Sequence, residues 1–148
     1  MKLHHYLAAL ALVSSFAYGA DGMIQVKSPH SAKVTADKLE HVVRDRGLVL
    51  FARIDHAAGA VKIGKSIRPT EVFVFGSPQA GTPFIECAQS VGIDLPLKAL
   101  VWEDAQGQVW LGYNEAQYIA KRHEAQSCPV VENIGKALTS IASAVVAP

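Results

Sequence analysis

The sequence predicts an α+β domain in which helices pack on one face of a mostly antiparallel sheet and a long helix ends the chain. The first indication is a hairpin, because two strand-like segments, 98–103 and 108–113, flank a tight turn that contains Gly107. The second is an apolar stripe at helical spacing after Pro129, formed by Val130, Ile134, Leu138, Ile141 and Val145. Neighbouring strands with helices on one side are typical of α+β folds.

The first half of the chain predicts a strand, a helix and a second strand. Residues 23–27 form a short strand candidate before Pro29. We expect a helix over 35–46, with Thr35 as its N-cap and Gly47 just past its end. Residues 48–54 then predict a strand, and residues 55–66 a loop or short irregular helix.

The second half begins with the apolar strand 71–75, which we expect near the sheet centre. A second helix is expected to open at Thr82-Pro83 and to end at Gly92. After the hairpin, Asn114 is the expected cap of a helix over 116–123. The final helix follows Pro129, and the sequence predicts a single domain over 23–147.

Residues 1–19 have the layout of a secretory signal peptide. Lys2 gives a cationic start, an uncharged Leu/Ala-rich run follows, and small residues precede a cleavage site expected between Gly19 and Ala20. The apolar run is too short to span a bilayer, and no cysteine follows the cut to carry a lipid. We therefore expect a periplasmic or secreted protein without a stable membrane anchor.

The net charge of the mature chain limits the classes of partner that it can be expected to bind. Cleavage leaves 129 of the 148 residues and removes Lys2, so 13 Lys and Arg face 13 Asp and Glu. This balance argues against nucleic acid and against an anionic membrane as the main partner.

Cys87 and Cys128 are the only cysteines. An even pair outside the cytoplasm favours a structural disulfide, which would close a loop of about 40 residues and contribute roughly 3–4 kcal/mol. A redox pair and a soft metal site remain alternatives, although the chain has no Cys-x-x-Cys.

The segment from Gly59 to Ser66 matches the phosphate-loop pattern G-x-x-x-x-G-K-[ST]. A phosphate loop must run into a helix whose amides hold the phosphates, and Pro69 would break such a helix in its first turn. We therefore interpret the match as coincidental.

An ordered set of short segments gives the chain a resemblance to a known family. The segments are Ile54-Asp55-His56, Arg68-Pro69-Thr70-Glu71, Phe75-Gly76-Ser77-Pro78, Asp94-Leu95-Pro96, Val101-Trp102-Glu103-Asp104, and Tyr113-Asn114 followed by Tyr118 and Arg122-His123. Over residues 35–123 the sequence resembles the domain of unknown function family 302. Ser77 and Glu115-Ala116 depart from the family pattern, which usually has Asn and Asp-Pro at these positions. The resemblance implies a compact α+β fold and suggests homodimers, but it implies no established activity.

The candidate site residues are Asp55, His56, Arg68, Asn114 and His123. A histidine beside a carboxylate can be a general base or a metal ligand. The structural alternative is that His56 ends a strand and His123 lies at a helix C-terminus. For Trp102 and Trp110 we favour core or dimer packing over ligand stacking.

Two hypotheses for the function remain. The favoured one is a non-catalytic module that binds a small ligand, a metal ion or a protein, because the chain has no recognisable nucleophile or metal motif. No cofactor is predicted. The most specific form of this binding hypothesis is a metal ion held by His56, His123 and a carboxylate. The alternative is a small hydrolase in which Asp55 orients His56 as the general base.

Overall fold

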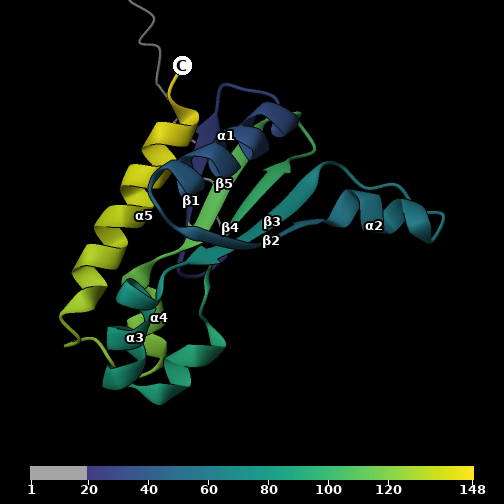
Figure 1. The fold of residues 1–148 in the computed structure, drawn as a ribbon. Coiled ribbons are helices and arrows are strands. Elements are labelled where there is room, and N and C mark those ends of the chain that lie inside the picture. Colours follow the sequence, from purple (N-terminus) through teal and green to yellow (C-terminus); the bar gives the residue numbers. More distant parts are fainter. Residues whose placement is uncertain (1–19) are drawn as a thin grey trace, which may run out of the picture.

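The computed structural model describes residues 20–148 and shows an antiparallel five-stranded sheet in the order β1-β5-β4-β3-β2 (Figure 1). The strands are β1 Met23–Ser28, β2 Val49–Asp55, β3 Thr70–Gly76, β4 Leu97–Glu103 and β5 Val109–Asn114. The predicted hairpin is β4–β5, and the apolar strand β3 lies inside the sheet between β2 and β4. The predicted α+β fold is therefore confirmed.

Two long helices cover one face of the sheet. Helices α1 (Ala32–Asp45) and α5 (Val130–Val146) contact each other and the strands (Figure 1). The predicted stripe on α5 is buried from Ile134 onward and Val130 is half-buried, and Phe73, Phe75 and Leu39 are buried with it. The long C-terminal helix is confirmed, and its apolar face forms the core with the sheet.

Helix α1 begins earlier than the sequence analysis predicts. Ser31, not Thr35, is the N-cap, and its hydroxyl accepts a hydrogen bond from the Val34 amide at 3.3 Å. Thr35 is instead fully buried, and its hydroxyl lies 2.7 Å from that of Ser28. Thr35 therefore joins α1 to the end of β1 instead of starting the helix.

Helix α3 (Pro78–Cys87) also begins earlier than expected, because Ser77 caps it and Pro78 is its first residue. Pro83, expected at the helix start, lies inside it. The short 3-10 helix η1 (Gln89–Ile93) follows. Helix α4 (Ala116–Arg122) is preceded by Glu115 at the cap position, because Asn114 stays in β5 opposite Met23.

The predicted disulfide is present. Cys87 ends α3 and Cys128 precedes α5, and the bridge joins them with a Cα–Cα distance of 5.9 Å. It therefore ties the lower group of helices in Figure 1 to the helix that packs on the sheet.

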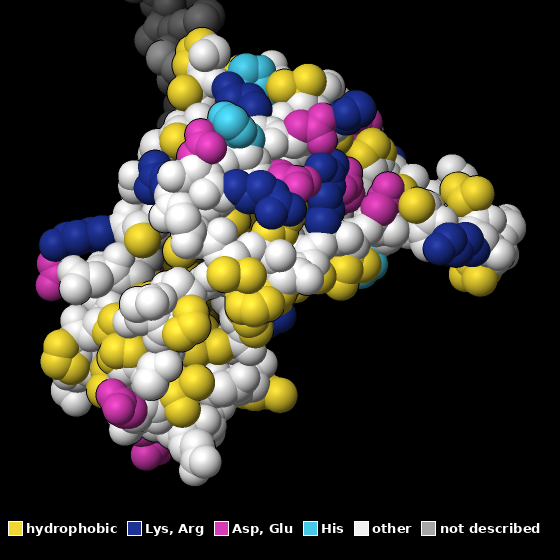
Figure 2. Space-filling model, in the orientation of Figure 1, with side chains coloured by type: hydrophobic (Ala, Val, Ile, Leu, Met, Phe, Trp, Pro, Cys, Tyr) yellow, Lys and Arg dark blue, Asp and Glu magenta, His cyan; other side chains and the backbone are white. Residues whose placement is uncertain are grey.

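The segment between β2 and β3 projects from the rest of the molecule (Figures 1 and 2). It contains the short helix α2 (His56–Lys62), capped by Asp55, and then an extended return to β3. The phosphate-loop match from Gly59 to Ser66 thus spans the end of a helix and the turn after it. No helix follows to receive a phosphate among these residues.

Candidate functional site

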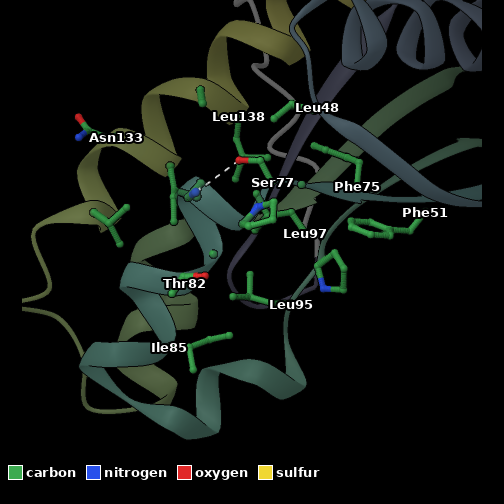
Figure 3. Close-up of a pocket in the computed structure, with 18 of the residues that line it drawn as sticks. Leu48, Phe51, Phe75, Ser77, Thr82, Ile85, Leu95, Leu97, Asn133 and Leu138 are labelled. Carbon is green, nitrogen blue, oxygen red and sulfur yellow. Dashed lines mark hydrogen bonds between the residues drawn. The ribbon is translucent and has the colours of Figure 1, made fainter.

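A pocket of about 400 Å³ opens between α3, α5 and one end of the sheet (Figure 3). Its walls come from the ends of β2 and β3, from α3, from the segment that leads into β4, and from α5. The lining residues include Leu48, Phe51, Phe75, Ser77, Ala80, Gly81, Thr82, Ile85, Leu95, Leu97, Asn133, Ala137 and Leu138. Segments far apart in the sequence therefore build one cavity.

The pocket is apolar, and none of its lining residues carries a charge. Three of them have polar side chains, namely Ser77, Thr82 and Asn133 (Figure 3). Thr82 and Asn133 are exposed, whereas Ser77 is half-buried. The Ser77 oxygen accepts the capping bond from the Ala80 amide at 3.3 Å, which leaves its hydroxyl hydrogen free to donate. Such an arrangement suits an apolar molecule with one or two acceptor groups.

Small residues keep this space open. Ala80 and Gly81 lie on α3, and Ala137 lies opposite them on α5. A Cβ atom on Gly81 would meet the Leu95 side chain at 3.6 Å, which is ordinary contact distance. Larger side chains at these positions would occupy the cavity, so the size of these residues sets its volume.

Asp55 and His56 lie at the root of the projecting segment and outside the pocket. The Asp55 carboxylate accepts a hydrogen bond from the Ala58 amide at 2.8 Å and so caps α2. His56 is the first residue of that helix and is exposed. Within residues 20–148 no hydrogen bond joins the two side chains. The geometry required for an oriented general base is therefore not formed here.

His123 lies at the other end of the fold, at the C-terminus of α4. Its ring contacts the Asp94 carboxylate through Nε2 at 2.6 Å and the Ser90 hydroxyl through Nδ1 at 2.9 Å. Arg122 donates to the second Asp94 oxygen at 3.1 Å. The His123 side chain is only 7% exposed, so these contacts tie α4 to the η1 segment.

The structure does not bring the predicted residues together. Helix α2, which carries His56, and helix α4, next to His123, lie at different ends of Figure 1. Arg68 donates to the Glu103 carbonyl at 3.2 Å, and Asn114 ends β5. In the described part of the chain, no group of three or more His, Cys, Asp or Glu side chains is placed to hold a metal ion.

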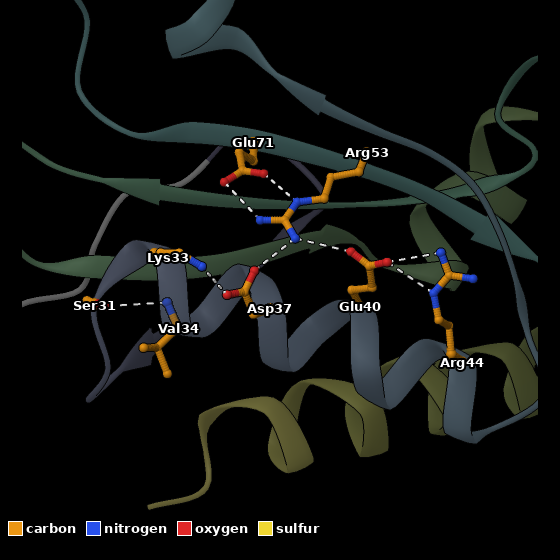
Figure 4. A network of polar contacts seen from close by, with 8 residues as sticks. All are labelled: Ser31, Lys33, Val34, Asp37, Glu40, Arg44, Arg53 and Glu71. Carbon is orange, nitrogen blue, oxygen red and sulfur yellow. Dashed lines mark hydrogen bonds and ion pairs between the residues drawn. The ribbon is translucent and has the colours of Figure 1, made fainter.

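The main charge cluster lies on the sheet face that α1 covers (Figure 4). Arg53 on β2 donates to Glu71, Asp37 and Glu40, at 2.6, 2.9 and 3.1 Å. Hydrogen bonds from Lys33 and then Arg53 lower the pKa of Asp37, and those from Arg44 and then Arg53 lower the pKa of Glu40. The glutamate and aspartate contacts raise the pKa of Arg53. This cluster holds α1 against β2 and β3.

No pattern in the sequence predicted the pocket as a site. Phe75 belongs to the apolar strand that was expected near the sheet centre, and it is buried, yet it also lines the cavity. An apolar side chain that faces a cavity has the same sequence signature as one that faces a neighbour. The local sign of the pocket in the sequence is the pair of small residues Ala80 and Gly81, which follows Ser77 by three residues.

Comparison with known proteins identifies the family. Residues 24–144 match the family described as Domain of unknown function DUF302. The chain belongs to this family. A crystal structure of an uncharacterized conserved DUF302 protein from Bacillus stearothermophilus has the same fold, with a TM-score of 0.76 over 85% of this chain and 99% of that one. The two sequences are 16% identical, so this DUF302 likeness concerns the fold alone.

Longer relatives of this DUF302 chain bear a different name. A protein named fluoride-specific ion channel FluC 1, from Brucella suis biovar 1, is 37% identical over 121 residues, which cover 82% of this chain and 45% of that protein. A protein named FluC 2 from Brucella melitensis biotype 1 is also 37% identical, over 43% of its length. The chain thus spans less than half the length of these curated relatives. Among residues 20–148, no helix has the length and apolarity that crossing a membrane requires.

Proposed function

We propose that this protein is a non-catalytic binding module for a small, uncharged and largely apolar molecule. The pocket of about 400 Å³ between α3, α5 and the sheet carries this proposal. We further propose that the module acts in the periplasm or outside the cell, after removal of residues 1–19. The layout of those residues supports this location.

The lining determines the class of ligand. A carboxylate or ammonium group inside the pocket would lose its hydration and find no opposite charge among the lining residues. A hydroxyl or carbonyl group could instead pair with Ser77 inside the pocket or with Asn133 near the solvent. Each apolar group that leaves water on binding would contribute roughly 25 cal/mol per Å² of buried surface.

The hydrogen bonds around the histidines favour binding over catalysis. The hydrolase alternative required Asp55 to orient His56, but the Asp55 carboxylate caps α2. Neither residue lines the apolar pocket. We therefore keep the non-catalytic function and assign Asp55 a structural role.

The name of the Brucella relatives belongs to the whole of those proteins. Less than half of each is matched by this chain. Channel activity and fluoride binding are therefore no part of the proposed function.

A second copy of the chain is the protein partner that we propose. Strand residues alternate between faces, so the neighbours of the buried Phe73 and Val101 point away from α1 and α5. That outer face carries the half-buried side chains of Val72, Val74 and Leu100 and the stacked rings of Trp102 and Trp110 at 6.3 Å, with Lys27 lying over the Trp110 ring at 5.5 Å. An outer sheet face in solvent is usually polar, so this one is suited to a symmetric dimer.

Sedimentation equilibrium tests the dimer. The mature protein should show a concentration-dependent dimer, and Leu100→Glu should give monomers because it places two carboxylates in the shared face. A wild-type protein that stays monomeric at high concentration would remove this partner from the proposal.

Narrowing the pocket tests the binding function. Ala137→Trp places a large ring at an exposed lining position of α5, whereas Ala105→Trp makes the same change in the β4–β5 turn, outside the pocket. We expect the fluorescence of N-phenyl-1-naphthylamine, an uncharged apolar probe, to rise on binding the wild type and Ala105→Trp. Binding to Ala137→Trp should be weaker by at least about tenfold, because a loss of about 1.4 kcal/mol of binding free energy lowers the affinity tenfold. Equal binding by the three proteins would contradict the proposal.

A further inference from the structure

The segment from His56 to Pro69 exposes large apolar side chains. We call this segment, which projects between β2 and β3, the arm (Figures 1 and 2). Val61 and Ile63 are 68% and 72% exposed, and Ile67 on the return is 49% exposed. When a short segment exposes several large apolar side chains, these commonly mark a site of interaction with another molecule.

The arm is also basic. Lys62, Lys65 and Arg68 lie within it, and no Asp or Glu occurs from residue 56 to residue 70. All three cations are exposed. Within residues 20–148, neither Lys62 nor Lys65 forms an ion pair, whereas Lys33 and Arg44 on α1 and Arg53 on β2 do. Figure 2 shows hydrophobic and basic side chains, and no acidic ones, on this face of the arm's far end.

We propose that the arm docks reversibly on an anionic phospholipid surface. The side chains of Val61 and Ile63 would enter the boundary between headgroups and acyl chains. Lys62 and Lys65, their immediate neighbours, would remain at the level of the phosphate groups, since a lysine reaches the interface with its charged end while its stem stays in apolar surroundings. This inference goes beyond the ligand proposed above and does not depend on it.

The positive charge of the arm favours lipid over a second copy of the arm as its binding partner. Two arms packed against each other would bring two sets of like charges together without acidic partners from either arm. An anionic bilayer instead attracts each basic residue near its surface by about 1 kcal/mol. The balanced charge of the whole mature chain does not oppose this, because three of its 13 cations lie in the arm and no acidic side chain accompanies them there.

Co-sedimentation with vesicles tests the inference. The mature protein should sediment with vesicles of phosphatidylcholine mixed with phosphatidylglycerol, much less with phosphatidylcholine alone, and less as salt is added. Ile63→Ser should weaken the binding about tenfold. Ile93→Ser is the matched control, since Ile93 in η1 is also 72% exposed but lies outside the arm, and it should bind like the wild type.

A second pair of variants tests the charge. Lys62→Gln with Lys65→Gln should weaken binding by about fivefold for each lysine removed. Lys121→Gln with Lys136→Gln removes the same charge from α4 and α5 and should change it little. Thermal unfolding of the arm variants should match the wild type because these side chains are exposed, and loss of the Lys136–Glu132 ion pair should lower the stability of its control only slightly.

Three results would overturn the inference. The first is an absence of binding to phosphatidylglycerol vesicles by the wild type. The second is equal weakening by the arm variants and their controls. The third is a lipid-free dimer that Ile63→Ser converts to monomers, which would make a second copy the occupant of the arm.

Discussion

The two candidate histidines differ in what their rings contact. His123 is nearly buried and contacts Asp94 and Ser90, whereas His56 is exposed at the start of α2. From the sequence, His56 beside Asp55 was the stronger candidate and His123 its possible companion, and their separation of 67 residues fixes no distance. The ring environment, which depends on the packing of η1 against α4, distinguishes them.

Replacing each histidine by alanine measures this difference. His123→Ala removes two hydrogen bonds at a buried ring and should lower the free energy of unfolding by about 2 kcal/mol. His56→Ala should change it by less than about 0.5 kcal/mol, since the ring is exposed. Urea unfolding at neutral pH provides both values. Equal values for the two variants would show that the His123 contacts contribute nothing to stability.

At the scale of elements, Arg53 holds helix α1 on the sheet. Its guanidinium joins β2 to Glu71 on β3 and to Asp37 and Glu40 on α1 (Figure 4). It also lies over the Phe73 ring, at 5.2 Å from the ring centre. One residue therefore connects three elements by charge and by packing.

Arg53→Met keeps much of the packing and removes the charge. We expect a loss of about 1–2 kcal/mol at pH 7, well above the lowered pKa values of Asp37 and Glu40. Arg44→Met, which removes one exposed pair with Glu40, should cost about 0.5 kcal/mol.

Acid should reduce the difference between Arg53→Met and the wild type. The pKa values of Asp37 and Glu40 lie below their ordinary values of 3.8 and 4.5, so the unfolded chain binds protons first as the pH falls. The stability that these ion pairs contribute is fully present above the ordinary pKa values of Asp37 and Glu40. It is lost as the pH falls through the lowered pKa values of the folded protein. Urea unfolding at pH 7 and near pH 3 measures it, and a difference that stays constant between the two would contradict this role of Arg53.

Some elements could be predicted because their signals are local. The stripe on α5 repeats with the helical period, and Gly107 has the positive φ that its turn requires. The start of α3 was missed because the helix was expected to open at Thr82-Pro83, after Ser77-Pro78. Serine followed by proline is also the signature of a capped helix start, so the local pattern alone allowed two structures.

At the scale of the whole molecule, the functional site depends on distances that the sequence does not contain. The disulfide could be expected from two cysteines and a signal peptide. The pocket could not, because it is a space left between α3, α5 and the sheet once they pack. Leu95 and Leu138, for example, lie on opposite sides of it and have the same apolar character as core residues.

The central claim is that this pocket binds an uncharged apolar ligand. The most direct measurement is a two-dimensional ¹H–¹⁵N NMR titration of the mature protein with 1-octanol. We predict saturable shifts of backbone amides around the pocket, among them Gly76, Gly81, Gly92 and Leu97, and unchanged signals at His56 and Asn114. Shifts that do not saturate, or that concentrate at His56, His123 and Arg68 while the pocket amides stay unchanged, would contradict the account.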